Sequence, residues 1–177
     1  LGETLAGLPG VSSSYFGPNA TRPVIRGQDG ERIRILNNAG ATLDASALSF
    51  DHAVPLDPLA VERIEVLRGP AALLYGGSAI GGVVNVIDNR IPQAVIDGVT
   101  GALELRGGGA ARERAASALV EAGGGGFALH ADAFTRRTDD LRVPDFDRPV
   151  EGGGSERRDR IVNSASDAEG GALGGSL

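Results

Sequence analysis

The stretch from Glu62 to Asp88 constrains the fold more than any other part of the chain, because two strand patterns flank a glycine-rich corner. Residues 63–67 alternate apolar and charged side chains, which is typical of a half-buried strand. Pro70 suits the first position of a short helix, which we expect over residues 71–75 before a pair of glycines ends it. Residues 83–87 are mostly β-branched and predict a second strand.

The glycine-rich corner does not match the phosphate-binding loops of nucleotide-binding proteins. A P-loop needs a lysine, and all 17 basic residues of this chain are arginine. A dinucleotide-binding fold needs the pattern G-x-G-x-x-G directly after its first strand, whereas residues 69–72 read GPAA. The sequence also contains neither G-x-S-x-G nor H-E-x-x-H. We therefore predict that the chain is not an enzyme and has no catalytic cofactor.

An ordered set of motifs surrounds this corner. The sequence reads VERIEVLRGP at 61–70, LYG at 74–76 and AIGGVVNVI at 79–87, after LPGV at 8–11 and VIRG at 24–27. In wording, order and spacing these motifs closely resemble the plug domain of TonB-dependent outer-membrane receptors. The resemblance implies a plug domain over residues 1–95 and a location in the bacterial outer membrane.

The rest of the N-terminal half indicates an α+β domain, because short strand and short helix patterns are mixed. The expected elements are a helix at 3–6, strands at 23–27 and 32–36, a turn at 17–19, and a loop over 41–58. Binding residues concentrate on loops that a rigid scaffold carries. We therefore expect the loop over 41–58 to hold the functional residues.

The C-terminal half alternates apolar and polar side chains over 99–106, 117–121 and 127–136, with a weaker strand pattern over 164–177 and a polar loop over 138–163. Such segments fit membrane barrel strands, but a soluble β-sandwich gives the same alternation. The resemblance favours the barrel. It implies that residues 96–177 are the antiparallel N-terminal strands of an incomplete outer-membrane β-barrel, because about four strands cannot close a barrel of about 22 strands.

Two neighbouring residues of the long loop are candidate metal ligands. Asp51 and His52 offer a carboxylate and an imidazole, which both bind first-row metals. Two ligands do not complete a zinc site, and a solvated Asp-His turn is the alternative. Residues 37–55, which read NNAGATLDASALSFDHAVP, resemble the zinc-uptake branch of the receptor family. That resemblance implies that Asp51 and His52 bind zinc, with further ligands from barrel loops.

Other charged residues are candidates for holding plug and barrel together. The resemblance implies that Arg26, Glu65 and Arg68 belong to a charged cluster that joins the plug to the barrel, since arginine–carboxylate pairs hold geometry well. Isolated surface charges of little energetic value are the alternative. His130 and Asp132 lie on the expected lumen face of a strand, where we expect a hydrogen-bond network rather than a metal site.

The resemblance implies a transport receptor that takes up a metal ion, zinc, into the periplasm. Its expected partners are the inner-membrane protein TonB, a metal ion or metal chelate, and the lipid around the barrel. The net charge of −6 argues against nucleic acid as a partner. A haem or ferric-siderophore receptor of the same family, and a soluble secreted α+β binding domain, are the alternatives.

Overall fold

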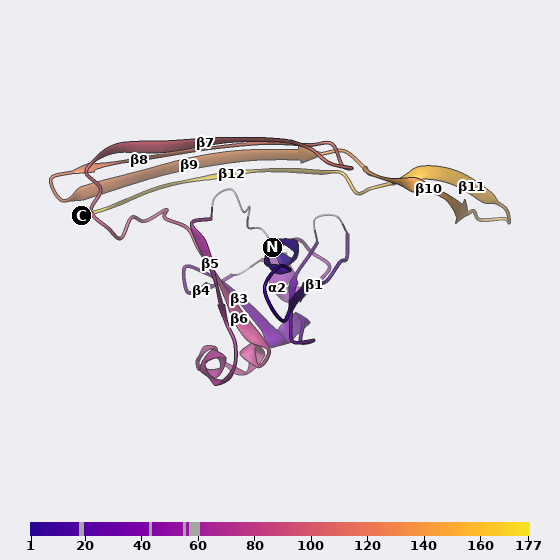
Figure 1. The fold of residues 1–177 in the computed structure, drawn as a ribbon, viewed down its shortest axis with the longest axis horizontal. Helices are drawn as coiled ribbons and strands as arrows, with labels where there is room; N and C mark the ends of the chain where they lie inside the picture. Colours follow the sequence, from indigo (N-terminus) through magenta and orange to yellow (C-terminus); the bar gives the residue numbers. More distant parts are fainter. Residues whose placement is uncertain (18–19, 43, 55, 57–60) are drawn as a thin grey trace.

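The protein folds into a small mixed domain, the plug, that lies against one face of a long antiparallel sheet (Figure 1). The computed structural model describes residues 1–17, 20–42, 44–54, 56 and 61–177. The expected turn at 17–19 and part of the expected loop over 41–58 fall outside the described residues.

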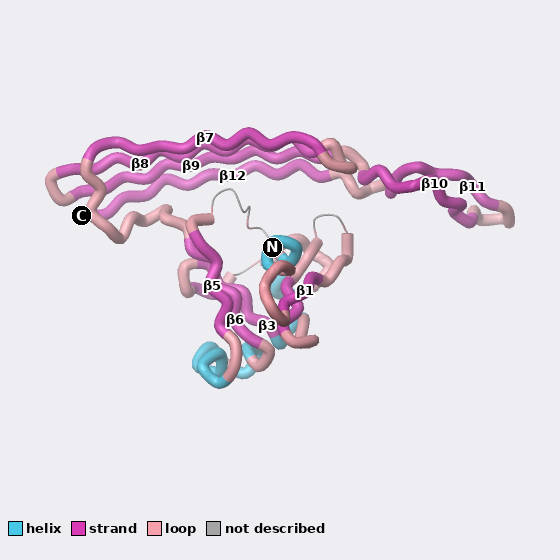
Figure 2. The backbone as a smooth tube through the Cα atoms, in the orientation of Figure 1, coloured by secondary structure: helices cyan, strands magenta, loops and turns pink. Residues whose placement is uncertain are grey.

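Short strands and single helical turns make up the plug (Figure 2). Its described elements are α1 (Gly2–Leu5), β1 (Val11–Ser13), β2 (Pro23–Ile25), η1 (Gly30–Arg32), β3 (Ile33–Asn37), β4 (Gly40–Ala41), α2 (Ala45–Leu48), β5 (Arg63–Leu67), η3 (Pro70–Tyr75), η4 (Gly77–Ala79) and β6 (Gly82–Ile87). The main sheet has the strand order β4-β3-β6-β5, with β3 and β6 parallel and the other pairs antiparallel. No helix of the described chain is long and apolar enough to cross a membrane.

The predicted strand–corner–strand unit is confirmed, with one difference in the helix. Pro70 does open the helical segment, but η3 is a 3-10 helix that ends at Tyr75. The glycines on both sides of it, Gly69 and Gly76, have φ values of +86° and +98°. Other residues adopt such values only at a steric cost. The chain therefore turns sharply at both ends of the segment.

The central strand β6 is buried on both faces and carries the plug core. Val84 and Val86 are 0 % and 1 % exposed and pack on one side with apolar residues of α1, β1, β2 and β3. Val83 points to the other side, where Ala72 of η3 and Ala79 of η4 cover it. A strand covered on both faces reads as a continuous apolar run. This explains the β-branched sequence over residues 83–87.

The second part of the structure is a four-stranded antiparallel sheet with the order β12-β9-β8-β7. Its strands are β7 (Gly98–Gly108), β8 (Glu113–Gly124), β9 (Phe127–Thr138) and β12 (Ser166–Ser176). The register puts Leu103, Ala118 and Ala133 side by side on one face, which is apolar and exposed. The face toward the plug is more polar and includes Glu121 and His130. The predicted alternation, apolar outward and polar inward, is confirmed, and the whole is the fold of a plug followed by part of a barrel.

The predicted polar loop over 138–163 is wrong. This segment contains a hairpin of β10 (Leu141–Pro149) and β11 (Ser155–Ile161) that extends beyond the end of the sheet (Figure 1). Besides the backbone pairing, an ion pair links the two strands, with Arg157 Nε 3.0 Å from Asp145 Oδ2. Hydrophobic periodicity cannot reveal a hairpin that depends on paired charges. β1 was missed as well, because its sequence VSS has only one apolar residue.

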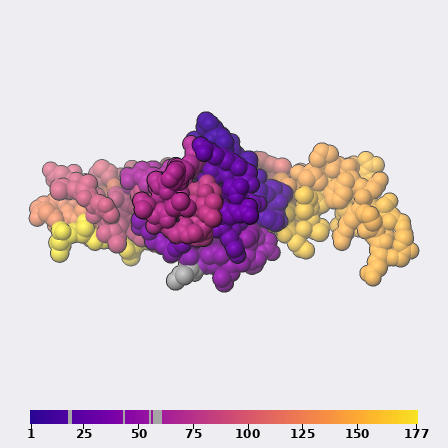
Figure 3. Space-filling model, turned by 90° about the horizontal axis from the view of Figure 1, so that it is seen from below, coloured from indigo at the N-terminus to yellow at the C-terminus, as the bar shows by residue number. Residues whose placement is uncertain are grey.

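The segment between β6 and β7, residues 88–97, is the linker that joins the plug to the sheet. It crosses the plug-facing side of the sheet so closely that a Cβ at Gly174 of β12 would lie 1.6 Å from the Arg90 carbonyl oxygen. A Cβ at Gly123 of β8 would lie 2.4 Å from the Ile96 carbonyl oxygen. Seen from below in Figure 3, the plug covers part of the sheet, one end of the sheet projects beyond it on the left, and the orange β10–β11 hairpin projects on the right. Small residues on the sheet thus make room for the linker.

We expect Gly174→Ala to displace the linker from the sheet, because its methyl group would collide with the Arg90 carbonyl oxygen. In the full-length protein, trypsin should then cleave after Arg90 faster than in the wild type. Gly124→Ala is the matched control, since a Cβ there meets nothing within 4 Å. Equal cleavage of the two variants would contradict the prediction.

Candidate functional site

The predicted metal ligands lie in the loop that follows α2. Asp44 caps this helix, because its Oδ1 accepts a hydrogen bond from the Ser46 amide at 2.8 Å. After the helix ends, the Ser49 amide bonds to the Ala45 carbonyl at 2.9 Å and the His52 amide bonds to the Ser49 carbonyl at 3.2 Å. The backbone of the loop is therefore ordered up to His52.

Asp51 and His52 point toward each other, as a loop permits for neighbouring residues. The distance between His52 Nδ1 and Asp51 Oδ1 is 3.1 Å, and the two side chains are 54 % and 63 % exposed. The Ser49 hydroxyl also donates a hydrogen bond to Asp51 Oδ1, and this bond lowers the pKa of Asp51 below its usual value. The carboxylate is therefore ionised over a wide pH range, as a metal ligand must be.

These two residues supply only part of a metal site. A protein zinc site takes at least three protein ligands. Among the described residues, no three His, Cys, Asp or Glu side chains converge in a way that could hold a metal ion. The assignment of Asp51 and His52 as ligands stays a prediction.

A buried arginine holds this loop to the plug and was missed in the sequence. Arg22 is 6 % exposed, and its Nη1 donates to the Ser46 carbonyl at 2.7 Å. Its guanidinium also lies 5.2 Å from the ring centre of Phe50, a distance at which a cation–π attraction acts. Burial lowers the pKa of Arg22, while the nearby Asp44 carboxylate acts in the opposite direction. Arg22 thus fixes the loop at Ser46 and at Phe50, the residue just before Asp51, and these two contacts are hereafter the Arg22 clamp.

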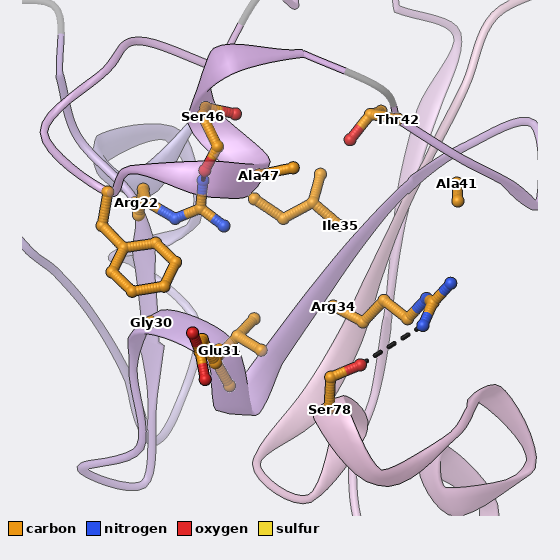
Figure 4. A pocket seen from close by; sticks show the side chains of 12 residues that line it. Arg22, Gly30, Glu31, Arg34, Ile35, Ala41, Thr42, Ser46, Ala47 and Ser78 are labelled. Atoms are coloured by element: carbon orange, nitrogen blue, oxygen red, sulfur yellow. Dashed lines mark hydrogen bonds between the residues drawn. The ribbon is translucent and has the colours of Figure 1, made fainter.

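An open pocket of about 400 Å³ lies beside the clamp (Figure 4). Arg22, Ser46 and Phe50 line one side of it and Ile35 lies in its wall. Arg34 lines the other side, where its Nη1 donates to Ser78 Oγ at 3.2 Å. Asp51 and His52 do not line this pocket. It therefore offers a separate surface with two guanidinium groups.

The predicted plug–barrel charged cluster is only partly brought together. A Cβ at Gly10 would lie 3.7 Å from Arg26 Cγ and 3.8 Å from Arg68 Nη1, so these two exposed arginines flank the same turn. Glu65 instead accepts hydrogen bonds from Arg63 Nε at 3.1 Å and Asn85 Nδ2 at 3.3 Å. The hydrogen bond from Arg63 lowers the pKa of Glu65. A joint role of Arg26, Glu65 and Arg68 toward the barrel stays a prediction.

His130 forms a hydrogen-bond network on the inner side of the sheet, as its position in the strand predicted. Its two ring nitrogens face Glu121 on β8 and Asp132 on β9. Glu121 was missed, although it lies directly opposite His130 in the register of the β8–β9 hairpin. Pairing the residues of β8 and β9 outward from the glycine turn that joins them would have identified Glu121 as the residue opposite His130.

We expect Arg22→Ala to loosen the loop from Ser46 to His52. The change removes a hydrogen bond from a charged donor, worth roughly 1.5–3 kcal/mol, together with the contact on Phe50. Hydrogen exchange of the Ser49 and His52 amides in the full-length protein should then accelerate by at least about tenfold. Arg32→Ala is the control, because among the described residues the hydrogen bond of this exposed side chain is to Gln28 at 3.1 Å, within its own turn. Unchanged exchange in Arg22→Ala would refute the clamp.

Comparison with known proteins supports the assignment of both parts of the chain. Residues 1–83 match the TonB-dependent Receptor Plug Domain family. The vitamin B12 transporter BtuB of Photobacterium profundum is 34 % identical over 151 residues, which cover 82 % of this chain and 24 % of that protein. This chain therefore spans about a quarter of that relative.

Solved structures share the fold across the plug and the sheet. The copper transporter OprC superposes with a TM-score of 0.68 at 22 % identity, over 87 % of this chain and 22 % of that one. The siderophore receptor PirA from Pseudomonas aeruginosa gives a TM-score of 0.55 at 27 % identity, over 78 % and 24 % of the two chains. These relatives are named as transporters and receptors, not as enzymes. The plug match over residues 1–83, the curated relative and the shared fold together support the TonB-dependent receptor family and an outer-membrane location for this chain.

Proposed function

We propose that this chain is the plug and first barrel strands of a TonB-dependent receptor that takes up zinc into the periplasm. One observation carries the choice of a metal ion: the exposed Asp51 carboxylate and His52 imidazole converge to 3.1 Å in a loop of the plug. The exposed apolar face of β7, β8 and β9 supports a lipid-facing wall rather than a soluble binding domain.

The proposed site uses the chemistry of both side chains. With Nδ1 directed at Asp51, the other ring nitrogen of His52 is available to a metal. The ionised carboxylate supplies an oxygen ligand and charge compensation. Further ligands would come from barrel loops, so that the ion lies between plug and barrel. Closure of the site by two separate parts of the receptor makes zinc affinity sensitive to their relative position.

That sensitivity supplies a release mechanism. Energised contact with TonB in the periplasm would rearrange the plug. Arg22, which directly precedes β2, binds the Ser46 carbonyl of the loop that carries Asp51 and His52, so a shift of this part of the plug would carry both residues with it. Separation from the barrel ligands would lower the affinity for zinc, and the ion would leave through the path opened in the plug.

A second candidate is a receptor for a haem, a ferric siderophore or another large anionic chelate. The pocket beside Arg22 and Arg34 favours it, because two guanidinium groups suit carboxylate or phenolate oxygens. The names of the relatives also cover vitamin B12, siderophores and copper. The same plug would then bind its ligand at the pocket instead of at Asp51 and His52.

Calorimetric titration of the full-length receptor tests the metal site. We expect zinc binding in the wild type and at least about a hundredfold loss in the Asp51→Ala/His52→Ala double variant, because each lost ligand of a metal costs several kcal/mol of coordination and charge compensation. Asp29→Ala, which removes another exposed carboxylate of the plug, should bind like the wild type.

Parallel titrations with copper, haem and a ferric siderophore separate the candidates. Zinc binding that survives the double variant would move the site away from Asp51 and His52. Tight chelate binding that is lost in Arg34→Ala, without any zinc binding in the wild type, would establish the second candidate.

A further inference from the structure

We infer that Glu121, His130 and Asp132 form an anchor on the inner barrel wall that holds the plug-to-barrel linker at Asn89 and Arg90. This inference concerns the junction of the two parts and is independent of which ligand the receptor carries. The three residues are hereafter the wall anchor.

The wall anchor is a buried, closely packed set of polar groups. The His130 side chain is 3 % exposed, and those of Glu121 and Asp132 are 18 % and 13 % exposed. His130 Nδ1 lies 3.0 Å from Glu121 Oε1, and His130 Nε2 lies 2.9 Å from Asp132 Oδ2. Opposite His130, β12 presents only Gly174. The imidazole is thus held from both sides by carboxylates of two neighbouring strands.

Both contacts are hydrogen bonds only when each ring nitrogen carries a proton, since an ionised carboxylate cannot donate. With both carboxyl groups ionised, the wall anchor is an imidazolium between two carboxylates. Loss of one proton would leave a nitrogen lone pair directed at a carboxylate oxygen at about 3 Å, which is repulsive. The wall anchor should hold best where His130 is charged.

The linker is bound to this group by two residues. Asn89 Nδ2 donates to Glu121 Oε1, the same oxygen that faces His130. Arg90 lies close enough to Asp132 for their charges to attract, and its pKa is raised chiefly by its hydrogen bonds to Asp88 with a further contribution from Asp132. The close approach of the Arg90 carbonyl oxygen to Gly174 fixes the backbone at the same place.

The plug side of the junction is also defined. Asp88 accepts a hydrogen bond from Asn38 Nδ2 at 2.8 Å and from Arg90 Nε at 2.9 Å. Burial would raise the pKa of Asp88, but these hydrogen bonds outweigh it and lower the pKa. Arg90 thus pairs with Asp88 at the plug end of the linker, and its charge is attracted to Asp132 of the wall. When the plug core moves, the linker beyond Arg90 should stay with the barrel.

A spin label at Gln93, an exposed residue of the linker, tests the inference in the full-length receptor. In the wild type we expect an immobilised spectrum. Glu121→Gln and His130→Gln should each lose the immobilised component, and Asn89→Ala should do so while leaving the contacts among the three wall residues intact. Glu113→Gln is the matched control, because Glu113 lies on the same face of β8 but pairs with Arg136 at 3.2 Å.

The pH dependence distinguishes an imidazolium anchor from mere packing. The wild-type label should stay immobilised at low pH and gain mobility as the pH rises through the titration of His130, whereas His130→Gln should show no such transition. Heat-modifiable migration on gels confirms that each variant has a folded barrel. The inference is overturned if the label stays immobilised in Asn89→Ala, if Glu113→Gln releases it equally, or if wild type and His130→Gln respond to pH alike.

Discussion

Two-sided burial of β6 is the constraint on which the plug depends. Because β6 has no solvent-exposed face over most of its length, something must cover each side. The glycine-rich corner covers one side with Ala72 and Ala79, and the N-terminal strands cover the other with Ile25 and other apolar residues. Loss of either layer would expose valines of the strand to water. The arrangement therefore ties the first and last thirds of the plug into one core.

The contact between plug and wall is of a different kind from the plug core. The core is apolar, whereas the linker meets the wall through amide, guanidinium and carboxylate groups. Polar contacts can be exchanged for contacts with water at a small net cost when the site opens. Buried apolar contacts cannot be exchanged in this way, because exposing apolar surface to water is unfavourable. A plug with an apolar core and a polar boundary is suited to move as a body, while the linker stays fixed where Asn89 and Arg90 meet the wall.

The candidate metal loop combines an anchored base with an exposed tip. Arg22 holds Ser46 and Phe50 from inside the plug, while Asp51 and His52 remain open to the surroundings. An anchored base limits the conformational entropy that the loop loses when it binds an ion. Exposure at the tip leaves both ligands free to meet groups from another part of the receptor.

The sequence by itself determined those structural features that depend on residues close together along the chain. Local patterns predicted the strand–corner–strand unit and the alternating strands of the C-terminal half, and they placed Asp51 and His52 in a loop as candidate ligands. Sequence could not predict the β10–β11 hairpin, the Arg22 clamp or the meeting of Asn89 with Glu121. Each joins residues far apart in the chain through charges and hydrogen bonds, which leave no periodic signal. Only the tertiary structure decided them, because partners of a polar contact are chosen by position in space and not by spacing along the chain.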